Sequence, residues 1–159
     1  MLPPLMRNPC AALLLLSLTG CAPKPEPPIQ AVATLGEVMH DIVIPNAEVV
    51  WDAVGTIYTL EGVEEIQPKT TEEWMAVERS ATTLMEAGNL LMMEPRAKDN
   101  KNWMQRAAAL RAAGDAVRKA ARERNPEAVF NRGGQLFEAC QGCHFEYRFE
   151  EDRTTIRTH

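Results

Sequence analysis

Cysteine, aromatic residues and long apolar runs are all scarce in this chain. The 159 residues include four cysteines, and aromatic residues make up 6% of the total. The apolar run at residues 11–18 is far shorter than the roughly 20 residues that are needed to span a bilayer. The formal net charge of −5 is unlike that of a strongly basic nucleic-acid-binding protein. The sequence therefore predicts one acidic globular domain without a nucleic-acid partner.

The N-terminus has the organisation of an export signal. Arg7 provides a short positive region, and the apolar run at residues 11–18 follows it. The run ends in Leu18-Thr19-Gly20-Cys21, which resembles a bacterial lipobox. This resemblance implies a signal peptide over residues 1–20 and a lipid on Cys21, which would tether the protein to the periplasmic side of a bacterial membrane, inner or outer. The alternative is an ordinary secretory signal that happens to end at a cysteine.

A proline-rich stretch separates this signal from the rest of the chain. Residues 22–30 contain four prolines, so residues 21–33 are expected to form a stiff, extended tether. Cleavage of the signal removes Cys10, and lipidation uses Cys21. Only two cysteines then remain in the domain, and no structural disulfide is expected.

These two cysteines belong to the motif Cys140-Gln141-Gly142-Cys143-His144, which has the C-x-x-C-H spacing of a c-type haem attachment site. On a helix, residues three apart lie side by side, so both thiols can bind the two vinyl groups of one haem. His144 can then serve as an axial iron ligand. A thioredoxin-like pair would need a βαβ context, a zinc site would need more ligands, and a chance match would have no cofactor.

The hydrophobic pattern predicts only helices. Thr34 and Glu37 form a capping box, and helices are expected over residues 34–44 and 46–58, separated at Pro45. Residues 59–69 have no sustained period and are expected to form a loop. The predicted apolar face of this first helical region comprises Leu35, Met39, Ile42, Val49, Val50, Ala53 and Ile57.

Three further helices follow. The second begins with a capping box at Thr70 and ends before Pro95, the third begins at Asp99 or Asn100, and the fourth begins at Asn125. Their apolar residues recur three and four apart, as in helix bundles. The predicted seams are Trp74, Val77, Ala81, Leu84, Gly88 and Leu91; Trp103, Ala107, Leu110, Gly114, Val117 and Ala121; and Val129, Phe130, Gly133, Leu136 or Phe137, Cys140, His144 and Tyr147.

The predicted fold is therefore all-α, an antiparallel four-helix bundle over residues 34–150 with a c-type haem on its C-terminal helix and a polar tail at 151–159. The chain resembles the cytochrome c′ family, or class II cytochromes c, in its helix number, in the motif on the last helix, and in Tyr147 and Arg148 after it. The resemblance implies that Arg148 lies near the axial histidine. Some family members pair through the first helix, so a homodimer is among the expected states.

The residue on the other side of the iron decides between two functions. In this family the first helix lines that side, and this helix carries Met39 and His40 as neighbours. Met39 shares the apolar face with Leu35 and Ile42, whereas His40 falls towards the acidic face, so Met39 is the expected sixth ligand. If Pro45 rotates the following turns, Trp51 shields the haem edge.

With a methionine ligand, the resemblance implies a periplasmic electron-transfer cytochrome that exchanges single electrons with a redox partner protein. Without it, the resemblance implies a five-coordinate protein that binds or senses nitric oxide or another small gas. A third class is a structural lipoprotein that lacks haem. No nucleophile–base pair or carboxylate pair indicates an enzyme.

Overall fold

The computed structural model describes residues 29–156, with side chains for residues 29–148. The signal peptide, Cys21 and most of the tether lie outside these residues. The described part is mostly helical with a small two-stranded sheet, so the all-α prediction agrees with the fold except for this sheet. None of the described helices is long and apolar enough to cross a membrane.

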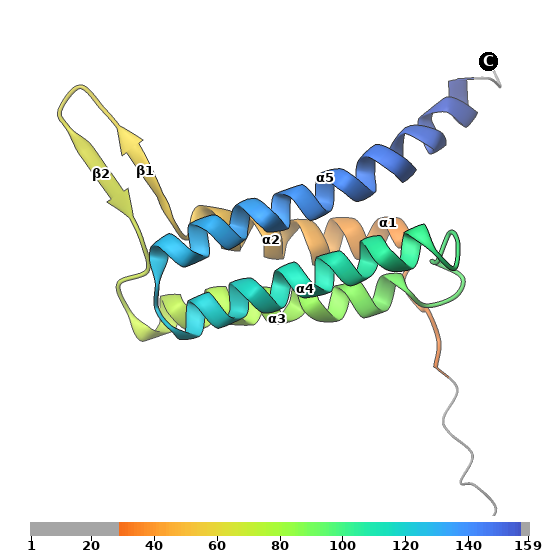
Figure 1. Cartoon of the computed structure of the whole chain (residues 1–159), viewed down its shortest axis with the longest axis horizontal. Helices are drawn as coiled ribbons and strands as arrows, with labels where there is room; N and C mark the ends of the chain where they lie inside the picture. Colours follow the sequence, from red (N-terminus) through yellow and green to blue (C-terminus); the bar gives the residue numbers. More distant parts are fainter. Residues whose placement is uncertain (1–28, 157–159) are drawn as a thin grey trace, which may run out of the picture.

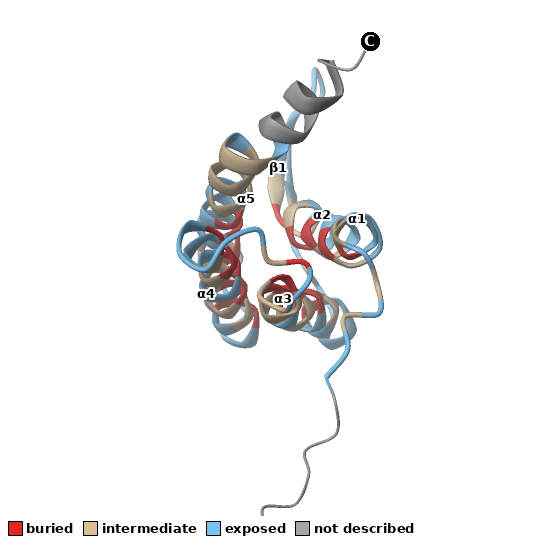
Figure 2. Cartoon of the chain, turned by 90° about the vertical axis from the view of Figure 1, so that its right-hand side faces the viewer, coloured by how far each residue is buried: buried red, intermediate tan, exposed pale blue. Residues whose placement is uncertain are grey.

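Four helical stretches lie side by side, and their buried positions face one another (Figures 1 and 2). The central stretch, α3, packs against both α4 and the N-terminal stretch, whereas α5 packs mainly against α4 and only lightly against α2. The N-terminal stretch is continuous and comprises α1 (Leu35–Glu37), η1 (Val38–Val43) and α2 (Ile44–Asp52). The other elements are β1 (Gly55–Tyr58), β2 (Val63–Ile66), α3 (Thr71–Leu91), α4 (Asn102–Arg122) and α5 (Pro126–Ile156).

The helix starts follow from their capping residues. Both predicted capping boxes form, at Thr34 and at Thr70, and each satisfies backbone N–H groups that have no partner within the helix. The side-chain oxygen of Asn125 accepts the N–H of Ala128 at 2.9 Å and caps α5. The α5 helix continues to Ile156 and so includes the backbone of residues 151–156, which the sequence pattern assigns to the polar tail.

The predicted seams of α3 and α4 are confirmed, since every one of their residues is buried. Two glycines allow these helices to approach closely. A Cβ atom at Gly88 would lie 2.8 Å from the carbonyl oxygen of Ala107, and one at Gly114 would lie 3.0 Å from that of Ala81. Late α3 thus meets early α4, so the two helices run in opposite directions.

The predicted break at Pro45 is wrong. The backbone continues through Pro45 as helix, and the six residues before Ile44 form the π-helix η1, in which Ile44 N–H bonds to Met39 O. Pro45 has no N–H to donate, and the side chain of Asn46 donates to the carbonyl oxygen of Ile42 at 2.7 Å. A π turn holds one more residue than an α turn, so the first two buried positions are five residues apart and the later ones are three or four apart. They are Val38, Val43, Ala47, Val50 and Val54.

The predicted apolar face is accordingly only partly correct. Val49 and Ile57 are 39% and 45% exposed, and Val38, Val43 and Ala47 are buried in their place. The remaining residues of the predicted face, Leu35, Met39, Ile42, Val50 and Ala53, are buried or packed against the core. The prediction assumed a constant rotation of 100° per residue, and the extra residue of η1 departs from it, so different residues lie on the buried face.

The predicted helix over residues 46–58 ends early, and the predicted loop over 59–69 is wrong. The α2 helix ends at Asp52, and β1 and β2 form an antiparallel hairpin that pairs Tyr58 with Val63 (Figure 1). Gly62 has a φ of +149°, which favours glycine at the turn. Residues 56–58 and 63–66 are rich in β-branched and aromatic side chains, and this composition was a strand signal.

Two glycine substitutions test the packing of the helices. We expect Gly88→Ala to lower the free energy of unfolding by about 1–3 kcal/mol, because its methyl group would contact the backbone of Ala107. Gly134→Ala on α5 has no neighbouring atom within 4 Å and is expected to raise stability by about 1 kcal/mol through helix propensity. Urea unfolding of both variants measures these changes. Equal effects at the two positions would contradict the close approach of α3 and α4.

Candidate functional site

The C-x-x-C-H motif lies on α5, as predicted. Cys140 and Cys143 are one helical turn apart, both are partly buried, and both are free thiols. His144 follows in the same turn and is also partly buried. The two thiols and the imidazole are therefore presented by one short segment of helix.

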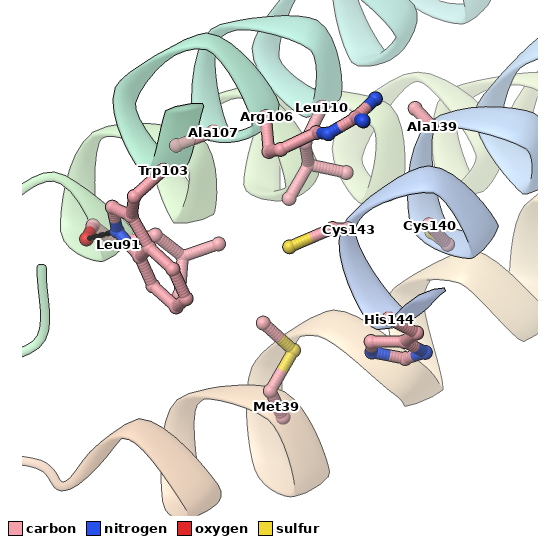
Figure 3. A pocket seen from close by; sticks show the side chains of 10 residues that line it. All are labelled: Met39, Leu91, Trp103, Arg106, Ala107, Leu110, Ala139, Cys140, Cys143 and His144. Carbon is pink, nitrogen blue, oxygen red and sulfur yellow. Dashed lines mark hydrogen bonds between the residues drawn. The ribbon is translucent and has the colours of Figure 1, made fainter. Parts of the chain in front are cut away.

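Two adjoining cavities lie beside this segment. A narrow void of about 20 Å³ is lined by Cys140, Cys143 and His144 from α5 together with apolar residues of α3 and α4 (Figure 3). A larger cavity of about 500 Å³ also contacts Cys143 and His144 and extends to the N-terminal stretch. Its volume lies within the roughly 300–1,000 Å³ of typical ligand sites. Met39 and Trp103 line both cavities.

The structure separates the two candidate ligands on the N-terminal stretch. Met39 is partly buried, and its side chain lies across the void from Cys143 and His144 (Figure 3). The His40 side chain is 85% exposed and pairs with Asp41 at 2.8 Å. Met39 is thus on the side of the predicted site, and His40 faces away from it.

Burial sets the protonation states of the motif. It raises the pKa of the Cys140 thiol. It also raises the pKa of the Cys143 thiol, and the positive charge of Arg106 partly opposes this shift. Partial burial and then the charge of Arg148 lower the pKa of His144, which favours the neutral imidazole that metals bind. Arg148 was predicted to lie near His144. Its effect on the pKa of His144 agrees with this prediction, and both residues line the larger cavity.

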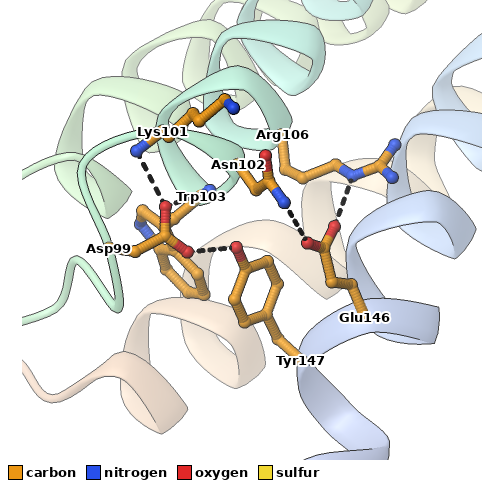
Figure 4. Close-up of polar contacts among 7 residues, drawn as sticks. All are labelled: Asp99, Lys101, Asn102, Trp103, Arg106, Glu146 and Tyr147. Carbon is orange, nitrogen blue, oxygen red and sulfur yellow. Dashed lines mark hydrogen bonds and ion pairs between the residues drawn. The ribbon is translucent and has the colours of Figure 1, made fainter.

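A polar cluster fastens the turn that follows the motif to the start of α4 (Figure 4). The Tyr147 hydroxyl donates to the Asp99 carboxylate at 2.5 Å, and the Tyr147 ring packs edge-on against Trp103 with their centroids 4.9 Å apart. Asp99 also accepts the backbone N–H groups of Lys101 and Trp103 at the start of α4, but the residue at the N-cap position is Lys101 and not the predicted Asp99 or Asn100. One carboxylate therefore joins the beginning of α4 to α5.

Glu146 provides the second attachment between these helices. Its carboxylate accepts from Asn102 Nδ2 at 2.8 Å and from Arg106 Nε at 3.1 Å (Figure 4). The Arg106 guanidinium lies close to the motif, because a Cβ atom at Gly142 would be 2.9 Å from Arg106 Nη1. A larger residue at this position of the motif would displace the end of the Arg106 side chain.

The lining of the two cavities carries positive charge only. Among their described lining residues, Lys98, Arg106 and Arg148 are basic and none is acidic, although the whole chain has 22 acidic and 17 basic residues. Two thiols, one imidazole, one thioether and cations around apolar walls suit an apolar, iron-containing ligand with anionic groups. These residues fit a c-type haem by their donor chemistry.

Comparison of the chain with models of known families, with curated proteins and with solved structures found no match. Within the described residues, no group of three or more His, Cys, Asp or Glu side chains is arranged to hold a metal ion. The function is therefore inferred from the chemistry of this site.

Several residues at the site were not found from the sequence. Asn102, Arg106 and Glu146 carry no pattern that distinguishes them from other polar residues on helix surfaces. Trp51 was expected at the haem edge only if Pro45 rotated the turns that follow it; the helix continues through Pro45, and Trp51 lines a separate apolar cavity of about 280 Å³. There its Nε1 donates to the carbonyl oxygen of Gly133 at 3.0 Å.

The Asp99–Tyr147 hydrogen bond predicts a defined pH dependence of stability. The Tyr147 hydroxyl and the Lys101 N–H lower the pKa of Asp99, whereas burial and the Asp99 carboxylate raise the pKa of Tyr147. The contribution of Asp99 to the free energy of unfolding is present above about pH 4 and is lost as the pH falls through the pKa of Asp99 in the folded protein. The contribution of Tyr147 to the free energy of unfolding is present below about pH 10 and is lost as the pH rises through the pKa of Tyr147 in the folded protein.

We therefore expect Tyr147→Phe to be less stable than the wild type by a constant amount between about pH 5 and 9. The difference should shrink below about pH 4, as measured by urea unfolding at each pH. Tyr58→Phe, at an exposed tyrosine of the hairpin, is the control and should show no such trend. A Tyr147→Phe difference that is unchanged at about pH 3 would contradict the coupling.

Proposed function

We propose that this chain is a c-type cytochrome that resembles the cytochrome c′ family and transfers single electrons to and from a redox partner protein. In this proposal, residues 34–150 form an antiparallel four-helix bundle. Cys140 and Cys143 hold one haem covalently, and His144 and Met39 are the axial ligands. The observation that carries the proposal is that all four of these side chains line one cavity (Figure 3).

Each of these residues has a distinct task. The two thiols would hold the haem through its vinyl groups and fix the orientation of the porphyrin. His144, whose pKa is lowered by partial burial, would present an imidazole nitrogen, and Met39 would present a thioether from the facing helical stretch. When bound, the haem supplies a ferric–ferrous couple, whose potential a thioether ligand raises. Trp103, Leu91 and Leu110 exclude water from this side of the site.

The export signal supports a location for this activity. A lipid on Cys21 would tether the domain to the periplasmic side of a bacterial membrane. In proteins of the cytochrome c′ family, haem is attached to C-x-x-C-H on the exported side of that membrane. A signal peptide over residues 1–20 and the C-x-x-C-H motif thus point to the same compartment, although they lie at opposite ends of the sequence.

Covalent attachment has a direct test. Full-length protein from a bacterial host that attaches haem c is denatured and stained for haem. We expect the wild type to retain haem and the variant with both Cys140→Ala and Cys143→Ala to lose it, because thioether bonds survive denaturation. Met104→Ala is a control from another helix. Colourless wild-type protein of apoprotein mass from a competent host would end the proposal.

The ferric absorption spectrum tests the sixth ligand. Met39 coordination predicts a low-spin spectrum for the wild type and a high-spin spectrum for Met39→Ala. His40→Ala is the matched control and should leave the spectrum unchanged, because His40 faces solvent. A high-spin wild type would favour the five-coordinate alternative, which binds nitric oxide or another small gas. A low-spin spectrum that survives Met39→Ala would show that the ligand is a different residue.

A further inference from the structure

The hairpin of β1 and β2 stands away from the helices (Figure 1). Its two strands pair with each other and pack little against any other described element. A two-stranded sheet is only marginally stable by itself, and a third strand or a packed helix is normally needed to stabilise it. The hairpin also exposes four large apolar side chains, those of Ile57, Tyr58, Leu60 and Val63. It is therefore a candidate interaction surface.

The outer edge of β1 carries backbone groups that face away from β2. Thr59 N–H donates to the carbonyl oxygen of Gly62 at 2.8 Å, and Tyr58–Val63 is the next pair along the ladder. Hydrogen-bonded and non-hydrogen-bonded pairs alternate in an antiparallel ladder, so Thr56 and Tyr58 direct their N–H and C=O groups outwards. No other described segment forms a backbone hydrogen bond with these groups.

The two edges of the sheet differ in charge. The β2 strand carries the neighbouring acids Glu64 and Glu65, and charged side chains on an edge strand oppose its pairing with another chain. The β1 strand has the sequence Gly-Thr-Ile-Tyr, with no charged residue and no proline. Its β-branched and aromatic side chains favour strand pairing. The edge that can accept a further strand is therefore that of β1.

The charge around β1 selects a basic partner. Glu65 lies opposite Thr56, and its carboxylate accepts the Thr56 hydroxyl at 3.2 Å. Glu64 lies opposite Ile57 on the other face of the sheet, because successive side chains of a strand alternate between faces. Residues 53–68 contain three glutamates and neither lysine nor arginine. An added strand would thus meet a carboxylate near β1 on each face, which favours lysine or arginine in that strand.

Other occupants of this edge fit less well. The hairpin of a second copy would bring like charges together, which destabilises strand pairs. Residues 22–30 of the same chain contain four prolines, and proline has no N–H to donate to a ladder. An anionic membrane surface attracts basic segments, whereas this hairpin is acidic.

We propose that the β1 edge binds an extended, basic segment of a partner protein as a third strand. The segment pairs with the backbone of Thr56 and Tyr58, and its cationic side chains lie beside Glu64 and Glu65. In this mode of recognition, backbone hydrogen bonds supply affinity and side chains supply specificity. The proposal is independent of haem binding, because no hairpin residue lines either cavity at the C-x-x-C-H motif.

Amide hydrogen exchange, measured by NMR on the full-length protein, tests the proposal. The probe is a short capped peptide of alternating valine and lysine. The amides of Thr56 and Tyr58 should exchange about tenfold more slowly when the free peptide is at about ten times its dissociation constant. The amides of Val63 and Glu65, which face outwards from β2, should not change. A peptide of alternating valine and glutamate is the control and should give no protection.

Substitutions separate the contribution of charge from that of the backbone. Glu64→Gln and Glu65→Gln should each weaken binding of the lysine peptide about two- to fivefold, as for an exposed charge pair. Glu48→Gln, at an exposed acid of α2, is the matched control and should have no effect. Thr56→Pro should abolish the protection of Tyr58, because it removes an outward N–H without removing a bond to β2.

Four outcomes would overturn the proposal. Protection of Val63 and Glu65 in place of Thr56 and Tyr58 would assign binding to the wrong edge, and equal binding of the two peptides would remove the selection by charge. Protection that appears without peptide as the protein concentration rises would show that a second copy occupies the edge. Unchanged exchange of Thr56 and Tyr58 with the lysine peptide would show that β1 does not accept a strand.

Discussion

The turn of α5 that follows Cys140, Cys143 and His144 is joined to the start of α4. Tyr147 bonds to Asp99, and Glu146 accepts from Asn102 and Arg106, over 2.5–3.1 Å. On the other side, α5 packs only lightly against the N-terminal stretch, and the large cavity lies between them. Hydrogen bonds to α4 thus hold the turn after the motif, while Cys143 and His144 border the cavity. Polar contacts with good geometry can hold the turn in register without filling the cavity.

The N-terminal stretch supplies the facing wall. Arg96, in the α3–α4 connection, is only 6% exposed and donates to the carbonyl oxygens of Ala33 and Leu90 at 2.9 and 2.7 Å. It therefore anchors the start of the stretch to the end of α3. Met39 lies in the π-helix after this anchor. The backbone that carries it is held before Met39 by Arg96 and after Met39 by the buried residues Val43 and Ala47.

Local sequence signals predicted much of this arrangement. Capping boxes at Thr34 and Thr70 and the three-and-four spacing on α3 and α4 depend on neighbours within one helix, and all are present in the structure. The placement of the motif on α5 and the choice of Met39 over His40 as the cavity-facing residue followed from the same helical geometry. The hairpin was missed because a helical projection was extended through Ile57, although the adjacent composition favoured strands.

Other parts of the site depend on contacts between distant segments. Glu146 meets Asn102 and Arg106, which are 44 and 40 residues earlier in the chain, and no pattern in one helix reveals which polar residue of the next it will face. The π-helix was not predicted; it lies just before Pro45, and its residues Val38 and Val43 are buried against other segments of the chain. Such widened turns occur frequently at functional sites.

The π-helix also gives the N-terminal stretch a particular tolerance to changes in length. A widened turn is equivalent to one residue inserted into an α-helix, so loss of a residue between Val38 and Val43 could be absorbed by a return to regular helix. Val38 and Val43, which are five apart across the π-helix, would then be four apart and would still share one face, so the helix before this point would keep its phase relative to α2. Thr34, Leu35 and Gly36 would stay in the cavity wall, and the buried positions of α2 would keep their contacts. The π-helix is therefore a place where the chain can become one residue shorter without turning the cavity wall against the core.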